Sequence, residues 1–312
     1  LLFCFCVLLI EDEYSKNYYV NDARLSGDVF GAGVGSDANP GTLAAPFATI
    51  QHAINTVPSG STVFVETGIY NEQVLVNKVV QITGAGGTKA EVNFSGTVGG
   101  KPTLFDVSVD GAGISDMYFN VDLSKIRSAI IASAVSLDNI SITNNTISAY
   151  GTPAGSYGDR NAVSINYAGP TNYRVAAGGV NAIVFTGNTI TGTSPSSFFR
   201  AGLATDESGV TASGNALGTI NHDILLRFSS NGNNTITGNT FNGGGMEVDD
   251  MNAGAGTLTI SNNTFDGTMA NIAAAGSPLL RLQNNYNGKT TIVSGNTFTA
   301  VDWGVNLSNY NN

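Results

Sequence analysis

A seven-residue pattern, written TITGNTF at Thr235–Phe241, occurs six times in this 312-residue chain. The other copies read SITNNTI, VFTGNTI, TASGNAL, TISNNTF and IVSGNTF. Self-similarity at this spacing predicts a solenoid, in which each repeat adds one layer and only stacking buries a continuous core. The fifth position of each copy is an anchor Asn, and the anchors are Asn145, Asn188, Asn215, Asn239, Asn263 and Asn296, separated by 43, 27, 24, 24 and 33 residues.

The columns of the repeat predict strands rather than helices. Apolar and polar residues alternate with period 2, and Thr, Ile, Val and Phe, which favour strands, dominate. We expect each anchor Asn to take the left-handed conformation at a bend between two strands, with its amide bonded to the next layer in an asparagine ladder. The column two residues before the anchor is polar and should point outward. Two apolar columns should point inward: Ile142, Phe185, Ala212, Ile236, Ile260 and Val293, and Ile147, Ile190, Leu217, Phe241, Phe265 and Phe298.

Composition is consistent with one large all-β domain, because the chain has 39 Gly and only 12% charged residues. Roughly 250 residues follow position 62, and at about 27 residues per turn they would form about nine turns of a parallel β-helix with three strand lanes.

Three segments precede the repeats. Residues 1–10, LLFCFCVLLI, resemble the apolar region of a clipped signal peptide and contain both cysteines, so the mature chain would lack disulfides. Residues 11–45 form an N-terminal segment. Residues 46–58 predict a capping helix that starts at Pro46 and covers the apolar end of the first turn, with His52 in solvent. The β-helix would occupy residues 59–312 and continue beyond them in the parent chain.

The run GSDANPGTLAAPFATIQHAINTVPSGSTVFVETGIYNEQVLVNKVVQITGAG, residues 35–86, resembles the opening of exported bacterial right-handed parallel β-helix proteins of the pectin-lyase-like superfamily. The resemblance implies a right-handed β-helix and places a substrate groove on the lane that precedes each repeat. The same run of residues is also similar to the start of pectin methylesterases. The later motifs of those esterases, of polygalacturonases and of pectate lyases are absent from this sequence, so no named activity follows from the resemblance.

The lane that precedes each repeat carries most of the arginines. It includes the segments AVSINY, FFRAGL, ILLRFS, MEVDDM, LLRLQN and GVNLSN, and alternation predicts an outward set of Asn166, Arg200, Arg227, Glu247, Asp249, Arg281 and Asn306. Five of the seven arginines lie on this lane or beside it. Tyrosine rings stack on sugars and arginine binds carboxylates, so we predict a polysaccharide-binding groove. Its binding residues would be Tyr157, Arg160, Asn166, Tyr173, Arg174 and Arg200. A ladder of surface ion pairs is the alternative.

The same lane suggests a candidate catalytic set. Glu247 and Asp249 lie two residues apart on a strand, hence about 6.5 to 7 Å apart, near the lower limit for an inverting glycosidase. Arg227 and Arg281 on adjacent turns would keep both carboxylates ionised, which opposes general-acid catalysis. A polysaccharide lyase that uses Arg with carboxylate-bound calcium is the other alternative. His222 and Asp223 read as polar loop residues.

Other classes are less well supported. The net charge of −10 and the pI of about 4.5 argue against nucleic-acid binding, and no segment is long enough to span a membrane. No zinc-ligand cluster is present. The uncharged Thr and Ser face of the repeats leaves a non-catalytic adhesin or ice-binding rod as a further alternative. We expect a monomeric module of a longer chain, secreted or displayed at the cell surface.

Overall fold

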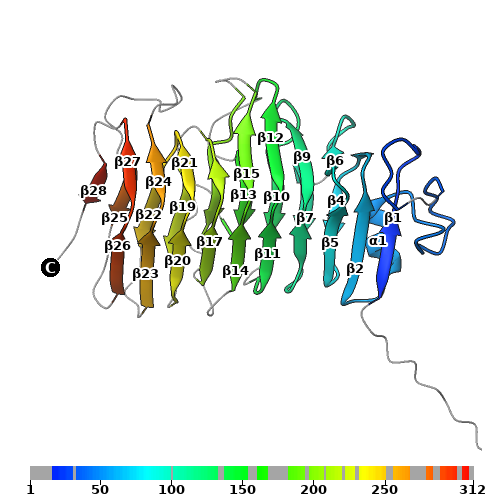
Figure 1. Cartoon of the computed structure of the whole chain (residues 1–312), viewed down its shortest axis with the longest axis horizontal. Coiled ribbons are helices and arrows are strands. Elements are labelled where there is room, and N and C mark those ends of the chain that lie inside the picture. Colours follow the sequence, from blue (N-terminus) through cyan, green and yellow to red (C-terminus); the bar gives the residue numbers. More distant parts are fainter. Residues whose placement is uncertain are drawn as a thin grey trace, which may run out of the picture.

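The structure is a computed structural model, and it describes residues 16–30, 33–99, 101–132, 137–153, 160–167, 182–193, 197–206, 209–219, 222–228, 232–250, 256–267, 279–283, 289–300 and 304–308. The chain winds into a parallel β-helix, which confirms the predicted fold class (Figure 1). Three parallel sheets run the length of the solenoid. Each full turn, or rung, contributes one strand to each sheet, giving nine rungs from rung 1 (β2, β3, β4) to rung 9 (β26, β27, β28).

The first sheet has ten strands and contains the beginning of each repeat. Its strands, in stacking order, are β1 (Asn17–Val20), β2 (Ser61–Glu66), β5 (Val80–Ala85), β8 (Gly113–Ser115), β11 (Ile140–Thr143), β14 (Ile183–Thr186), β17 (Val210–Ser213), β20 (Asn234–Thr237), β23 (Gly256–Ser261) and β26 (Lys289–Ser294). Strand β1 lies before the first rung and pairs in parallel with β2.

The second and third sheets have nine strands each. The second contains β3 (Ile69–Asn71), β6 (Ala90–Asn93), β9 (Met117–Asp122), β12 (Thr146–Tyr150), β15 (Thr189–Gly192), β18 (Ala216–Leu217), β21 (Thr240–Asn242), β24 (Thr264–Asp266) and β27 (Thr297–Thr299). The third contains β4 (Val74–Val76), β7 (Thr103–Val107), β10 (Ser128–Ala132), β13 (Asn161–Ile165), β16 (Ala201–Thr205), β19 (His222–Phe228), β22 (Met246–Asp250), β25 (Leu280–Gln283) and β28 (Val305–Ser308).

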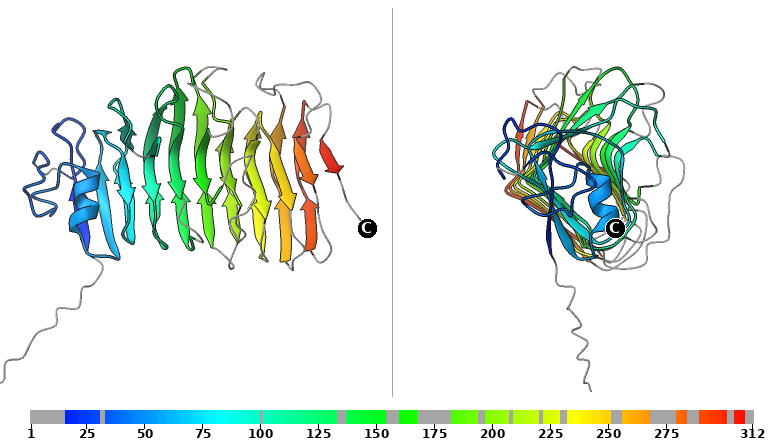
Figure 2. Two further views of the ribbon diagram at one scale, coloured as in Figure 1. Left: turned by 180° about the vertical axis from the view of Figure 1, so that it is seen from behind. Right: turned by 90° about the vertical axis from the view of Figure 1, so that its right-hand side faces the viewer.

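The single described helix, α1 (Ile50–Thr56), lies over the N-terminal end of the solenoid (Figure 2). It begins four residues later than predicted from Pro46. The side chain of Thr49 caps it by accepting from the backbone N–H of His52, and the carboxylate of Glu72 accepts the next free N–H groups, those of Ile50 and Gln51, at 2.9 Å each. Glu72 lies 22 residues further along the chain, so no local helix signal contains it.

The apolar face of this helix is buried as predicted, including Phe47, Ile50, Ile54 and Val57. His52 is half-buried, with its ring 5.0 Å from that of Phe47 in an edge-on contact. Within the described residues, no helix is long and apolar enough to cross a membrane.

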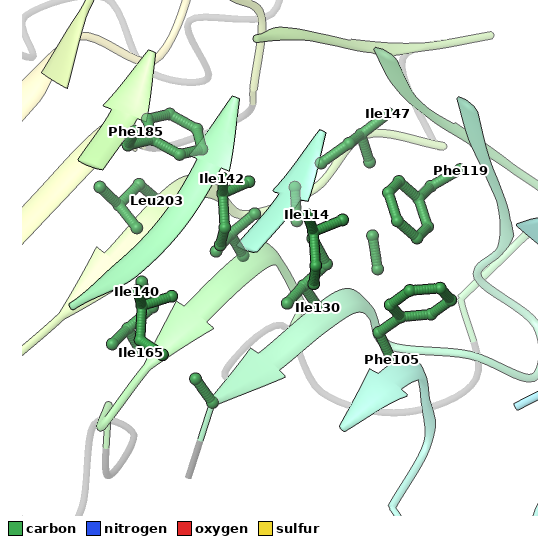
Figure 3. Close-up of a cluster of buried hydrophobic side chains, with 14 of the residues drawn as sticks. Phe105, Ile114, Phe119, Ile130, Ile140, Ile142, Ile147, Ile165, Phe185 and Leu203 are labelled. Atoms are coloured by element: carbon green, nitrogen blue, oxygen red, sulfur yellow. The ribbon is translucent and has the colours of Figure 1, made fainter. Parts of the chain in front are cut away.

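The two apolar columns and the inward residues of the third sheet form the core. Figure 3 shows its central part, where Phe105 and Phe119 from rungs 2 and 3 lie beside Ile114 and Ile147. Both columns point inward as predicted, except at the last rung. There Val293 is 42% exposed and Phe298 is only partly buried, because no described strand packs above rung 9.

The anchor asparagines bond to one another along the solenoid axis. In the first step, the backbone N–H and the side-chain amide of Asn145 both donate to the side-chain oxygen of Asn188. The same two bonds recur at every later step, with donor–acceptor distances of 2.7 to 3.2 Å. The series continues through Asn215, Asn239 and Asn263 to Asn296. The first member also accepts from the backbone N–H of Met117, which occupies the anchor position one rung earlier.

The prediction that the anchor asparagines adopt the left-handed conformation is wrong. The residue before each anchor adopts it instead: Asn144, Gly187, Gly214, Gly238, Asn262 and Gly295, with φ between 55° and 66°. Gly and Asn are the residues that tolerate this region most readily, which explains why every copy reads Gly-Asn or Asn-Asn. The preceding residue makes the bend, and the anchor is free to point its amide inward.

This division of roles predicts the outcome of two substitutions at Gly238. A Cβ at Gly238 would meet no atom within 4 Å, so only the backbone conformation matters. Gly238→Ala should lower the free energy of unfolding by about 1 to 2 kcal/mol, whereas Gly238→Asn should be close to neutral. Urea denaturation of both variants checks this. Equal losses for Ala and Asn would show that the left-handed bend is not the constraint at this position.

Candidate functional site

The outer face of the third sheet brings together the predicted carboxylates and two of the predicted arginines. Strand register aligns Leu225, Glu247, Arg281 and Asn306 in one column from β19 to β28. A second column, two residues further along the strands, pairs Arg227 with Asp249. The structure does not describe the side chains of Leu225, Arg227 and Asp249.

Glu247 and Arg281 form an ion pair on this face. The Arg281 Nη1 atom lies 3.6 Å from Glu247 Oε2, and the side chains are 46% and 15% exposed, respectively. The pair thus places a guanidinium that keeps much of its surface open beside a mostly buried carboxylate.

Arg200 does not belong to this row, in contrast to the prediction. It precedes β16, and in its rung the position aligned with the Glu247 column is taken by Ala204, four residues further along. Its Nη1 donates to the hydroxyl of Tyr167 at 3.2 Å. Alternation correctly predicts the face of a residue, but the distance along the strand depends on the lengths of the intervening loops.

Arg160 and Asn166 are not exposed groove residues either. They are only 4% and 5% exposed. Asn166 follows β13 in the left-handed region, at a φ of 45°, and its backbone N–H donates to Ala132. The predicted binding residues Tyr157, Tyr173 and Arg174 lie outside the described residues.

Tyr167 is a residue of this face that the sequence did not single out. It packs against Ala201 and Ala204, both fully buried, and so covers the outer face of β16. Tyr167 therefore covers part of β16 in rung 5, and the charged columns begin in the next rung. The signal was available, because Tyr167 ends the segment AVSINY and two small residues face it.

The prediction that Asp223 is a polar loop residue is wrong. His222 and Asp223 begin strand β19, and Asp223 is fully buried. Its Oδ1 accepts from the Thr219 hydroxyl and its Oδ2 from the backbone N–H of Gly245, both at 3.0 Å. Burial raises the pKa of Asp223 to about 8, although these hydrogen bonds oppose the rise. The carboxyl group joins consecutive rungs and lies out of reach of a ligand.

A pH dependence of stability follows from this burial. The folded protein retains the Asp223 proton, whereas the unfolded chain releases it near pH 4, so the contribution of Asp223 to stability is fully present below about pH 4 and falls as pH rises towards about 8. Between about pH 6 and pH 7.5 the fall should be about 2 kcal/mol. Urea denaturation of the protein and of Asp223→Asn at both pH values should show that difference, because Asn does not ionise. A pH-independent difference would mean that Asp223 is ionised throughout.

The outer face of the second sheet carries another polar patch that the sequence did not single out. Glu91 Oε1 accepts from the side-chain amides of Asn93 and Asn120 at 3.1 and 2.8 Å. Tyr150 pairs in register with Asp122, and its pKa is raised by burial and then by the charges of Asp122 and Glu91. This patch lies on rungs 2 to 4, away from the charged columns of the third sheet.

Hydroxyl groups of the Thr and Ser column on the first sheet hydrogen-bond to one another between neighbouring rungs. Hydroxyl groups of adjacent rungs lie 3.1 Å apart at Thr186 and Ser213, and 3.2 Å apart at Ser261 and Thr237. Cross-strand pairs of this kind stabilise a sheet, so sheet stability accounts for the column without a ligand. Among the side chains that the structure describes, no group of three or more His, Cys, Asp and Glu residues is placed to hold a metal ion.

Comparisons with known proteins agree with the fold. No protein-family model matches the chain. A 125-residue stretch, 38% of the chain, is 27% identical to the uncharacterized protein YwoF of Bacillus subtilis (strain 168) and covers 23% of it. The structure resembles that of the GH136 lacto-N-biosidase from Eubacterium ramulus, with a TM-score of 0.60 and 11% identity, over 91% of this chain and 56% of that one. The chain thus spans less than two thirds of either relative, and the structural likeness concerns the fold.

Proposed function

We propose that the protein binds polysaccharide through the outer face of the third sheet, at rungs 6 to 8. The observation that carries this proposal is the ion pair of Glu247 with the half-open guanidinium of Arg281. The register of Arg227 opposite Asp249 in the adjacent column supports it. Only 12% of the residues of the chain are charged, so four charged residues in two adjacent columns are unusual. Arginine donors suit the carboxylates and hydroxyls of a sugar chain.

The fold supports the same class of ligand. The lacto-N-biosidase that shares the β-helix is named as a carbohydrate-active enzyme. We place the protein in the pectin-lyase-like superfamily on the resemblance of residues 35–86. We also propose that it is secreted or displayed at the cell surface, on the apolar run of residues 1–10.

Arg281→Ala should separate binding from folding. An exposed ion pair adds less than about 1 kcal/mol to stability, so the melting temperature should change little. Binding to an acidic oligosaccharide identified on a glycan array should weaken about tenfold, or about 1.4 kcal/mol. Isothermal titration calorimetry measures the change. Arg24→Ala is the matched control, because Arg24 is exposed but lies in the N-terminal segment. Unchanged binding by Arg281→Ala would contradict the proposal.

A glycoside hydrolase is the second candidate, and it is favoured by the lacto-N-biosidase activity for which the structural relative is named. Glu247 and Asp249 lie on one face of β22 and would be its carboxylates. New reducing ends after incubation with the bound glycan, lost in Asp249→Asn, would support this candidate. Unsaturated ends that absorb in the ultraviolet, and that require added calcium, would instead indicate a lyase. Binding without any cleavage would leave a non-catalytic module.

A further inference from the structure

Residues 21–30 carry the carboxylates of Asp22 and Asp28, and they contact the first rung where Val29 and Phe30 donate to the carboxylate of Glu66 in β2. Glu66 is fully buried and accepts from the backbone N–H groups of Val29, Phe30 and Thr67 at 2.7 to 2.9 Å. Backbone donors thus satisfy this carboxylate.

Asp22 is satisfied in the same way. It is 9% exposed and accepts from the backbone N–H groups of Arg24 and Ile69. Neither Asp22 nor Glu66 forms an ion pair with a basic side chain among the described residues. Tyr70 lies between these groups, and its pKa is raised by burial and then by the charges of Asp22, Glu66, Glu72 and Asp28. All four carboxylates thus act on one tyrosine, and among the described residues no basic side chain forms an ion pair with Asp22, Asp28 or Glu66.

Asn21 and Asp28 differ from the other two, because each has a side-chain oxygen without a donor. Asn21 is fully buried, and its Nδ2 donates to Asp28 Oδ2 at 2.9 Å and to the Gly33 carbonyl at 3.3 Å. These two acceptors set the orientation of the amide, since a flipped amide would place its oxygen against them. Asn21 Oδ1 and Asp28 Oδ1 are both shielded from solvent, and neither has a hydrogen-bond donor.

Two buried acceptors without donors are costly, and these two belong to side chains that are hydrogen-bonded to each other, one of them a carboxylate. A buried water could donate to both oxygens, but it would leave the negative charge of Asp22, Asp28 and Glu66 uncompensated. A cation would satisfy both requirements. Carboxylate, amide and carbonyl oxygens are ligands of hard cations, calcium foremost. The two proposed ligands are one carboxylate and one amide, so the absence of clusters of three or more His, Cys, Asp and Glu residues among the described side chains does not bear on this site.

We propose that Asp28 Oδ1 and Asn21 Oδ1 bind a calcium ion that holds residues 21–30 against the first rung, with Asp22 and Glu66 supplying the surrounding negative charge. The ion would complete the N-terminal end of the solenoid, beside the capping helix. This site is independent of the proposed polysaccharide-binding face, which lies at the opposite end of the rung series.

Thermal unfolding of the full chain tests the proposal. After treatment with a chelator, the melting temperature should rise by about 5 °C when calcium is restored at about a hundredfold excess over its dissociation constant. Asp28→Asn should abolish this rise. Asp37→Asn is the matched control, because Asp37 lies in the same N-terminal segment and accepts from the backbone N–H groups of Ala48 and Thr49. It should lower the melting temperature and leave the calcium-dependent rise intact.

A direct measurement covers the case in which Asp28→Asn does not fold. Terbium, a calcium substitute, should bind the unmodified chelator-treated protein with tyrosine-sensitised luminescence, and calcium should displace it. Three outcomes would overturn the proposal. In one, calcium, magnesium and sodium leave the melting temperature unchanged and no metal co-purifies, which would indicate buried water. In another, Asp28→Asn responds to calcium as the parent does. In the last, terbium shows no sensitised luminescence.

Discussion

Asn239→Ala should lower the free energy of unfolding by about 3 to 5 kcal/mol, because it removes the acceptor or donor of several buried groups at once. Asn239 Oδ1 accepts from the backbone N–H and the side-chain amide of Asn215, at 3.0 and 2.7 Å. Its Nδ2 donates to Asn263 Oδ1 and to the carbonyl of Ala212. Alanine would leave the N–H of Asn215 and the carbonyl of Ala212 buried without their partners. Chemical denaturation of the full chain measures the loss.

Thr237→Ala is the control for that substitution. Thr237 lies two residues away on the outer face and makes one hydroxyl contact, with Ser261 at 3.2 Å. Loss of a partly exposed hydroxyl pair should cost under about 1 kcal/mol. If Asn239→Ala were no more destabilising than Thr237→Ala, the axial bonds would not contribute net stability, and water would be replacing them.

Phe265→Ala should also cost about 3 to 5 kcal/mol. Phe265 is fully buried, and its ring stacks between those of Phe241 and Phe298, with ring centroids 4.6 and 4.8 Å away. Removal of the middle ring deletes both contacts and leaves a cavity that two rigid strands cannot close. Differential scanning calorimetry and urea denaturation both report this change.

Phe265→Leu separates lost volume from lost stacking. Leucine keeps much of the buried volume, so its cost should be well below that of alanine, about 1.5 kcal/mol or less if repacking suffices. A Leu variant as unstable as the Ala variant would show that the stacked geometry itself contributes. An Ala variant with parental stability would mean that rungs 7 to 9 do not share one continuous core.

The sequence alone was sufficient to predict the type of fold and the residues that form its core. The side-chain period of 2 assigns each residue to a face, and identical columns must stack when a repeat is short. The inward columns, the number of rungs and the buried face of the capping helix follow from these local rules. Val293 deviates only because no described strand covers it.

Only the tertiary structure decided which residues share a site. The position of Arg200 relative to Glu247 depends on loops that follow no repeat, so alternation placed it on the right face but not in the charged row. The burial of Arg160, Asn166 and Asp223 likewise depends on neighbours from other rungs. The first turn of the helix is capped by the local Thr49 and also by Glu72, a partner distant in sequence. Local patterns specify the conformation of a residue and the face on which it lies. Its partners come from the stacking of segments that are distant in sequence, and contacts between those segments determine the chemistry of this protein.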